Sequence, residues 1–160
     1  MPASIVPGRW ELEVEDWYPG SSPARTETVR RTLTLDTLLP WSQIPELADS
    51  AGIGRYRTTV TLPADWSDAH GAVLELGQVS DTVRVTVNGT RTAPVDRLHP
   101  VVDLGGLLRA GENTVEIEVA TPLINRLRVT RPEVFGTTAR QAYGLTGPVR
   151  LVPYAQAAVE

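Results

Sequence analysis

The 160-residue sequence predicts an all-β protein, built as a two-sheet antiparallel sandwich in a single domain that spans residues 1–160. Three observations favour this fold class. Apolar and polar residues alternate with a period of two along most of the chain, as in strands with one buried face. Turn residues separate these runs at short spacing, and the chain holds 13 Gly and 13 Pro. No long helical pattern is present, so helical crossovers between parallel strands are not expected.

The expected strands follow this alternation in chain order. Apolar residues occupy every second position in residues 10–14, 29–35, 56–62, 83–87, 115–119, 127–129 and 149–151. Residues 73–76 form a more continuously apolar run, which also predicts a strand. Short helical turns are expected within 41–50 and within 104–108, and residues 17–24 (WYPGSSPA) are interpreted as a loop. We therefore expect about seven to nine strands.

Several polar residues have a structural interpretation. Asn88 and Gly89 follow an apolar run and predict a type I′ hairpin turn, because both central residues of that turn need positive φ. The same residues with Thr90 also match a glycosylation sequon, but the turn is favoured. Asp103 is expected to cap the short turn that follows it. Asn113 lies beside a glycine turn and is expected to bond nearby backbone groups.

Composition excludes several classes of chemistry. The chain has no Cys, which removes disulfides, zinc–thiolate sites and a Cys nucleophile. All 15 basic residues are Arg, so Schiff-base and P-loop lysine chemistry are excluded as well. The net charge of −4 argues against a nucleic-acid partner, since binding phosphates needs a basic surface.

No segment is suited to a membrane. The longest stretches without a charged residue are nine residues, for example 37–45, whereas a transmembrane helix needs about 20 apolar residues. The first residues lack the basic and apolar regions of a signal peptide. The chain is therefore expected either in the cytoplasm or as a piece of a longer exported protein.

Ordered motifs from residue 39 to residue 154 resemble the galactose-binding-like jelly roll that serves as the sugar-binding domain of glycoside hydrolase family 2. The matching segments are 41–47 (WSQIPEL), 54–63 (GRYRTTVTLP), 74–79 (LELGQV), 83–89 (VRVTVNG), 102–113 (VDLGGLLRAGEN) and 144–151 (GLTGPVRL). The resemblance implies that 39–154 form the core of the domain, with 1–38 adding strands and a loop. It also implies that Trp41 and Tyr56 lie in the core or an interface.

A further segment narrows the resemblance. Residues 120–127 (ATPLINRL), followed by GLTGPV, are similar to the C-terminal sandwich of bacterial α-L-rhamnosidase-like glycoside hydrolases of family 106. This resemblance implies a non-catalytic domain that supports the catalytic domain of a parent hydrolase and contacts carbohydrate. It also implies a bacterial parent protein that is secreted or otherwise extracytoplasmic. The isolated chain is not expected to be an enzyme, since it has no nucleophile elbow and its strand acids are expected on a solvated face.

Candidate carbohydrate-binding residues combine aromatic rings with polar groups near loops, because aromatic faces stack on sugars while Arg and Asp bond hydroxyls. They are Trp17, Tyr18, Trp66, Asp81 and Arg126. No metal-ligand spacing is present and no cofactor is expected, although carbohydrate modules of this architecture often hold a structural calcium ion through loop oxygens.

Two alternative functions remain open at this point. The chain could be an independent carbohydrate-binding module with shallow binding by its loops. It could also be a structural protein-interaction domain, which would present an exposed apolar patch of several hundred Å².

Overall fold

Eleven strands and a few short helices make up the computed structural model, which describes residues 3–79 and 81–157. The strands are β1 (Trp10–Pro19), β2 (Thr26–Leu35), β3 (Gly52–Leu62), β4 (His70–Glu75), β5 (Gln78–Val79), β6 (Thr82–Val87), β7 (Thr90–Arg91), β8 (Val101–Asp103), β9 (Gly111–Ala120), β10 (Leu145–Gly147) and β11 (Arg150–Ala155). The helices are η1 (Trp41–Gln43), η2 (Pro45–Leu47), η3 (Gly105–Leu107), α1 (Ile124–Thr130) and α2 (Pro132–Phe135).

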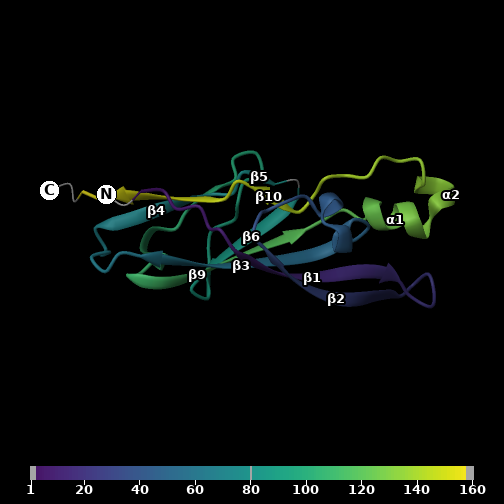
Figure 1. Cartoon of the computed structure of the whole chain (residues 1–160), viewed down its shortest axis with the longest axis horizontal. Helices are drawn as coiled ribbons and strands as arrows, with labels where there is room; N and C mark the ends of the chain where they lie inside the picture. The colour runs from purple at the N-terminus through teal and green to yellow at the C-terminus, as the bar shows by residue number, and fades with distance from the viewer. Residues whose placement is uncertain (1–2, 80, 158–160) are drawn as a thin grey trace.

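The strands form two layers. One layer is a six-stranded sheet in the order β2-β1-β3-β9-β6-β7, and the other contains the sheets β11-β4-β8 and β10-β5. All of these strand pairs are antiparallel. In Figure 1, β4, β5 and β10 lie above β1, β2, β3 and β9, with α1 and α2 at the end where the β1–β2 hairpin turns. The predicted all-β sandwich is therefore confirmed.

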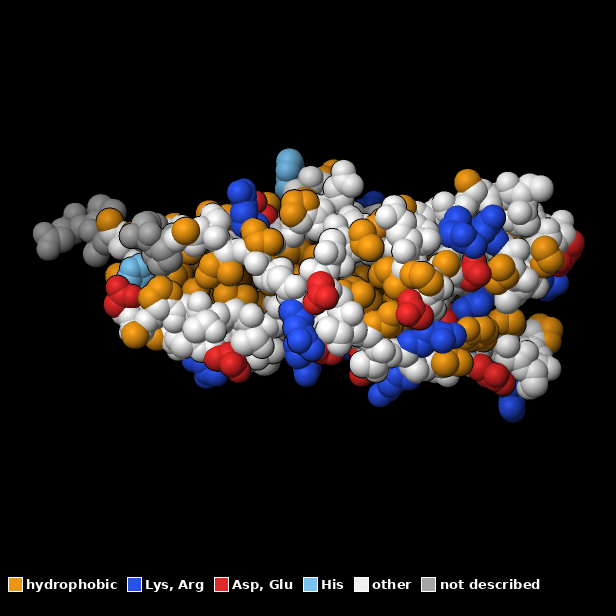
Figure 2. Space-filling model, viewed as in Figure 1, with side chains coloured by type: hydrophobic (Ala, Val, Ile, Leu, Met, Phe, Trp, Pro, Cys, Tyr) orange, Lys and Arg blue, Asp and Glu red, His pale blue; other side chains and the backbone are white. Residues whose placement is uncertain are grey.

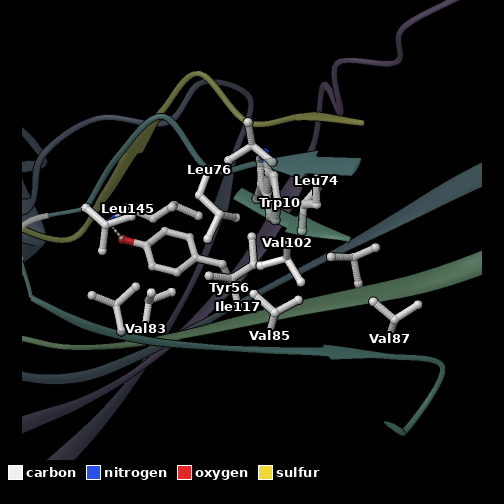
Figure 3. Packing of buried hydrophobic residues seen from close by; sticks show 14 of the residues in the cluster. Trp10, Tyr56, Leu74, Leu76, Val83, Val85, Val87, Val102, Ile117 and Leu145 are labelled. Atoms are coloured by element: carbon white, nitrogen blue, oxygen red, sulfur yellow. Dashed lines mark hydrogen bonds between the residues drawn. The ribbon is translucent and has the colours of Figure 1, made fainter. Parts of the chain in front are cut away.

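The core lies between the layers and follows the alternation of the strands. Figure 3 shows Val83 and Val85 of β6 and Ile117 of β9 facing Leu74 and Leu76 from the opposite layer. Each of these side chains is buried, and burying one contributes roughly 1.5–3 kcal/mol relative to leaving it in water.

A hydrogen-bonded aromatic group closes one part of this core. The Tyr56 hydroxyl accepts from Trp41 Nε1 at 2.7 Å and from the Leu145 amide at 3.1 Å. Both rings are fully buried, so Trp41 and Tyr56 are core residues, in agreement with the prediction. Burial raises the pKa of Tyr56 to about 12.

Three of the predicted turn residues, Asn88, Gly89 and Asn113, have the expected local roles. Asn88 and Gly89 have φ of 49° and 83°, which confirms the type I′ conformation. The Asn113 side chain accepts from the Arg109 amide and donates to the carbonyls of Arg109 and Gly111. Asp103 does not occupy the N-cap position of the following turn, which is Leu104. Its Oδ1 instead accepts from the Gly105 amide at 2.9 Å and from the Tyr154 hydroxyl at 2.7 Å.

Two predictions about local structure are wrong. Residues 127–129 are in helix α1 instead of a strand, because Leu123 and Leu127 are spaced four residues apart and the Leu127 amide donates to the Leu123 carbonyl. Residues 17–19 are not in a loop, because β1 continues pairing with β2 through Pro19. Within the described ranges, none of the helices has the length and apolar character needed to cross a bilayer.

Candidate functional site

The candidate site lies where the end of β1 meets helix α1. Its centre is Asp16, which is fully buried. Along β1 the even-numbered residues Trp10, Leu12 and Val14 face the core, and Asp16 continues this set. A carboxylate at such a position is costly to desolvate unless charged or polar groups surround it.

Four groups donate hydrogen bonds to Asp16. Arg126 Nη2 lies 2.9 Å from both carboxylate oxygens, and Arg31 Nε lies 3.0 Å from Oδ2. The Ser50 hydroxyl donates to Oδ2 at 2.7 Å, and the Ala51 amide donates to Oδ1 at 3.3 Å. Burial raises the pKa of Asp16, but the hydrogen bonds from Arg126, Ser50 and Arg31 outweigh this effect and hold the pKa below its usual range.

The two arginines also organise Tyr18. The Arg126 guanidinium carbon lies 3.8 Å from the centre of the Tyr18 ring, a cation–π geometry. Arg31 Nη2 donates to the Tyr18 hydroxyl at 2.7 Å, and Arg126 Nε donates to the Trp17 carbonyl at 3.2 Å. Arg126 therefore joins helix α1 to the end of β1 through one carboxylate, one carbonyl and one ring.

A pocket of about 290 Å³ opens beside this cluster. The residues that line it come from the β1–β2 hairpin and from the segment around α1, and they are Trp17, Tyr18, Pro19, Thr26, Leu123, Arg126, Leu127, Thr130 and Arg131. The lining is mainly apolar, and its two charged residues, Arg126 and Arg131, are both basic. The structure thus brings Trp17, Tyr18 and Arg126, three of the sequence-predicted site residues, to one place.

The other two predicted site residues lie elsewhere. Trp66 is in the core with its ring stacked on His70 at 5.2 Å between ring centres, so the expectation that it is a free loop aromatic is wrong. Its neighbours in the sequence are polar, which made a buried position hard to foresee.

Asp81 borders a separate hollow of about 390 Å³ together with Arg84, Arg91, Arg97, Thr82 and other residues of β6, β7 and the following loop. Asp81 Oδ2 is buried and has no hydrogen-bond partner among the described residues. Burial raises the pKa of Asp81, and the charge of Arg97 offsets part of this.

The site gives no support to a metal centre built from side chains. In residues 3–79 and 81–157, no three Asp, Glu or His side chains come together in a way that could hold a metal ion. Calcium stays an untested prediction.

Comparisons with known proteins show which solved structures share this fold. No family model matches the chain, and no curated protein matches it. Among solved structures, the rhamnosidase from Novosphingobium sp. PP1Y matches with a TM-score of 0.73 and 24% identity, over 96% of this chain and 16% of that chain. A Faecalibacterium prausnitzii β-glucuronidase matches with a TM-score of 0.60 and 16% identity, over 95% of this chain and 31% of the β-glucuronidase chain.

A β-glycosidase from Bacteroides vulgatus is also similar, with a TM-score of 0.55 and 19% identity, over 95% of this chain and 20% of that one. Glycoside hydrolases contain this fold. The chain spans less than a third of the length of each of these three enzymes. At these identities the likeness concerns the fold of one β domain.

Proposed function

We propose that this chain is a non-catalytic β-sandwich domain of a glycoside hydrolase of the α-L-rhamnosidase type, and that it supports the catalytic domain. The observation that carries the proposal is the match of nearly the whole chain, 96%, to only 16% of a rhamnosidase. A match of a whole short chain to a small part of a longer enzyme is typical of an accessory domain.

The charges of the described residues favour a non-catalytic role. Glycoside hydrolysis uses two carboxylates across an open site, but the pocket beside α1 has no acidic residue in its lining. Glu11, Glu13 and Glu116 do line one shallow hollow, where Arg55 and Arg57 lie among them. Arg57 pairs with Glu116 at 2.8 Å and Arg55 with Glu13 at 3.6 Å, so these acids are engaged in ion pairs.

The test compares the 160-residue chain with the native polypeptide that contains it, using p-nitrophenyl α-L-rhamnoside and a panel of other p-nitrophenyl glycosides. We expect hydrolysis by the native polypeptide and none by the chain alone. Hydrolysis by the chain alone would contradict the proposal, and so would an inactive native polypeptide. Cell fractionation of the source organism tests the associated expectation that the parent protein is exported.

Carbohydrate binding is a second candidate function, and the hollow beside Asp81 favours it. A buried carboxylate oxygen without a partner among the described residues is suited to accept from a sugar hydroxyl, and Arg84, Arg91 and Arg97 are suited to donate to others. Calorimetry with rhamnose, galactose and pectic oligosaccharides, with and without calcium, tests this. Binding that Asp81→Asn weakens at least tenfold supports the site, and no binding by the unmodified chain rejects it.

A further inference from the structure

We propose that the end of the molecule formed by α1, α2 and the tip of the β1–β2 hairpin is the surface that docks onto the catalytic domain. The partner surface would be an acidic segment of that domain that inserts one bulky apolar side chain into the pocket beside Tyr18. This inference rests on the proposed function and names the surface through which it acts.

The first argument is charge. Residues 121–144 contain four Arg and one Glu, although the whole chain has a net charge of −4. The arginines in this segment are Arg126, Arg128, Arg131 and Arg140, of which Arg131 is exposed and lines the pocket. Three of these arginines have acidic partners within the chain, since Arg126 lies 2.9 Å from Asp16, Arg131 3.3 Å from Glu133 and Arg140 2.6 Å from Asp49. The pair of Arg131 joins two exposed side chains and is weak, so Arg131 can exchange Glu133 for an acidic partner, and charge complementarity of this kind selects partners and sets their register.

The second argument is apolar exposure. Leu123, Val129 and Val134 are 42%, 47% and 65% exposed, and all three lie in or next to the two helices. Figure 2 shows apolar, basic and acidic side chains lying beside one another at this end of the molecule. The pocket of about 290 Å³ has room for one large apolar side chain, and such side chains in pockets supply most of the binding energy of protein interfaces.

The third argument is that the surface is formed in advance. Asp16 and Arg126 join α1 to β1, while the Asn125 side chain donates to the Gln141 carbonyl and accepts from its amide, each at 2.8 Å. These bonds hold both ends of the segment, so docking does not have to order it. A preformed surface loses less entropy on binding.

A saccharide suits this pocket less well. Arg126 lies over one face of the Tyr18 ring, which leaves less of that ring for stacking on a sugar. The mainly apolar lining also offers few partners to sugar hydroxyls, so we favour a protein side chain.

The experiment measures maleimide labelling of single cysteines introduced into the native polypeptide, read at each site by peptide mass spectrometry. Val134→Cys probes the proposed surface, and Val6→Cys is the matched control, because the two residues are 65% and 64% exposed. Thr59→Cys probes the outer face of the six-stranded sheet. We expect position 134 to label at least tenfold more slowly than positions 6 and 59.

Charge reversal supplies the second readout. Arg131→Glu should bring labelling at position 134 to within about threefold of the rate at position 6, because it places an acid against the acidic partner. Arg84→Glu is the control, since the Arg84 and Arg131 side chains are similarly exposed, at 61% and 68%, and Arg84 lies outside this surface. It should leave the slow labelling unchanged.

Three results overturn the inference. They are equal labelling at positions 134 and 6, protection that Arg131→Glu does not relieve, and protection that appears only after pectic oligosaccharides are added. The last result assigns the surface to carbohydrate instead. Glycosidase activity of the same preparation reports on the proposed function separately, so an active enzyme with equal labelling rejects only the docking surface.

Discussion

The outer face of the six-stranded sheet and the α1–α2 end are both rich in Arg, but they use it differently. On the sheet, Arg55 lies 3.0 Å from Glu118, 3.5 Å from Glu15 and 3.6 Å from Glu13, so opposite charges interleave across neighbouring strands. At the α1–α2 end each arginine that pairs has one acid: Arg126 reaches the buried Asp16, Arg131 pairs with Glu133 and Arg140 with Asp49. Several apolar side chains are exposed nearby.

This difference indicates where a partner would bind. Both regions hold ion pairs, and desolvating such pairs is costly. The α1–α2 end differs in its exposed apolar side chains and its pocket, which a partner can bury. The exposed apolar side chains and the pocket therefore distinguish the α1–α2 end from the sheet more than its arginines do.

The largest expected effect comes from Asp16→Asn. It leaves Arg126 and Arg31 beside a neutral amide in a buried site, and removing one partner of a buried ion pair costs about 3–5 kcal/mol. Urea denaturation followed by circular dichroism measures this loss. The matched change on the sheet, Glu118→Gln, should cost about 1 kcal/mol or less, and equal losses for the two variants would remove the distinction between the regions.

Acid should weaken the α1–α2 end through the same carboxylate. The folded-state pKa of Asp16 lies below its ordinary value of 3.8, so the folded state binds the proton less readily than the unfolded state does. Its contribution to stability is present above that ordinary value and is lost as pH falls through the lower folded-state pKa. The difference in urea midpoint between the unmodified chain and Asp16→Asn should shrink steadily below about pH 4, and a constant difference down to pH 2.5 would contradict this.

A smaller effect is expected from Arg55→Gln on the sheet. Arg55 is partly exposed and meets three Glu side chains, so its loss should cost about 1 kcal/mol and should cost less in high salt. Urea denaturation at low and high salt measures both effects. A salt-independent loss of several kcal/mol would show that this face is not a screened network of surface ion pairs.

The smallest effect is expected from Arg84→Gln. Its ion pair with Glu118 is long, at 3.9 Å, and the Arg84 side chain is 61% exposed. Isolated surface pairs of this kind contribute about 0–1 kcal/mol. A loss of stability well above 1 kcal/mol in urea denaturation would mean that the paired face is more strongly coupled than its geometry indicates.

The alternation of apolar and polar residues predicted the fold, but the role of Asp16, the centre of the candidate site, was not predicted. Trp10, Leu12 and Val14 marked the buried face of β1, and Asn88 with Gly89 marked a hairpin. Asp16 occupies the next core-facing position of the same strand. An acid in phase with an apolar set is itself a signal of a buried ion pair, and that signal was available in the sequence.

The remaining differences came from long-range contacts. Leu127 and Val129 alternate around Arg128 as in a strand, but three residues are too few for alternation to distinguish a strand from a helix. Contact between α1 and β1 through Arg126 favours the helix. The convergence of Arg126 on Asp16 joins residues 110 positions apart. No local pattern could have indicated which of the 15 Arg would meet this carboxylate.

The most direct test of the account is a cryo-electron microscopy structure of the native polypeptide. We predict that α1 and α2 contact the catalytic domain, that an apolar side chain from an acidic segment fills the pocket beside Tyr18 and Leu127, and that Arg55 with its Glu partners faces solvent. A structure in which the α1–α2 end faces solvent and the outer face of the sheet is buried would contradict the account.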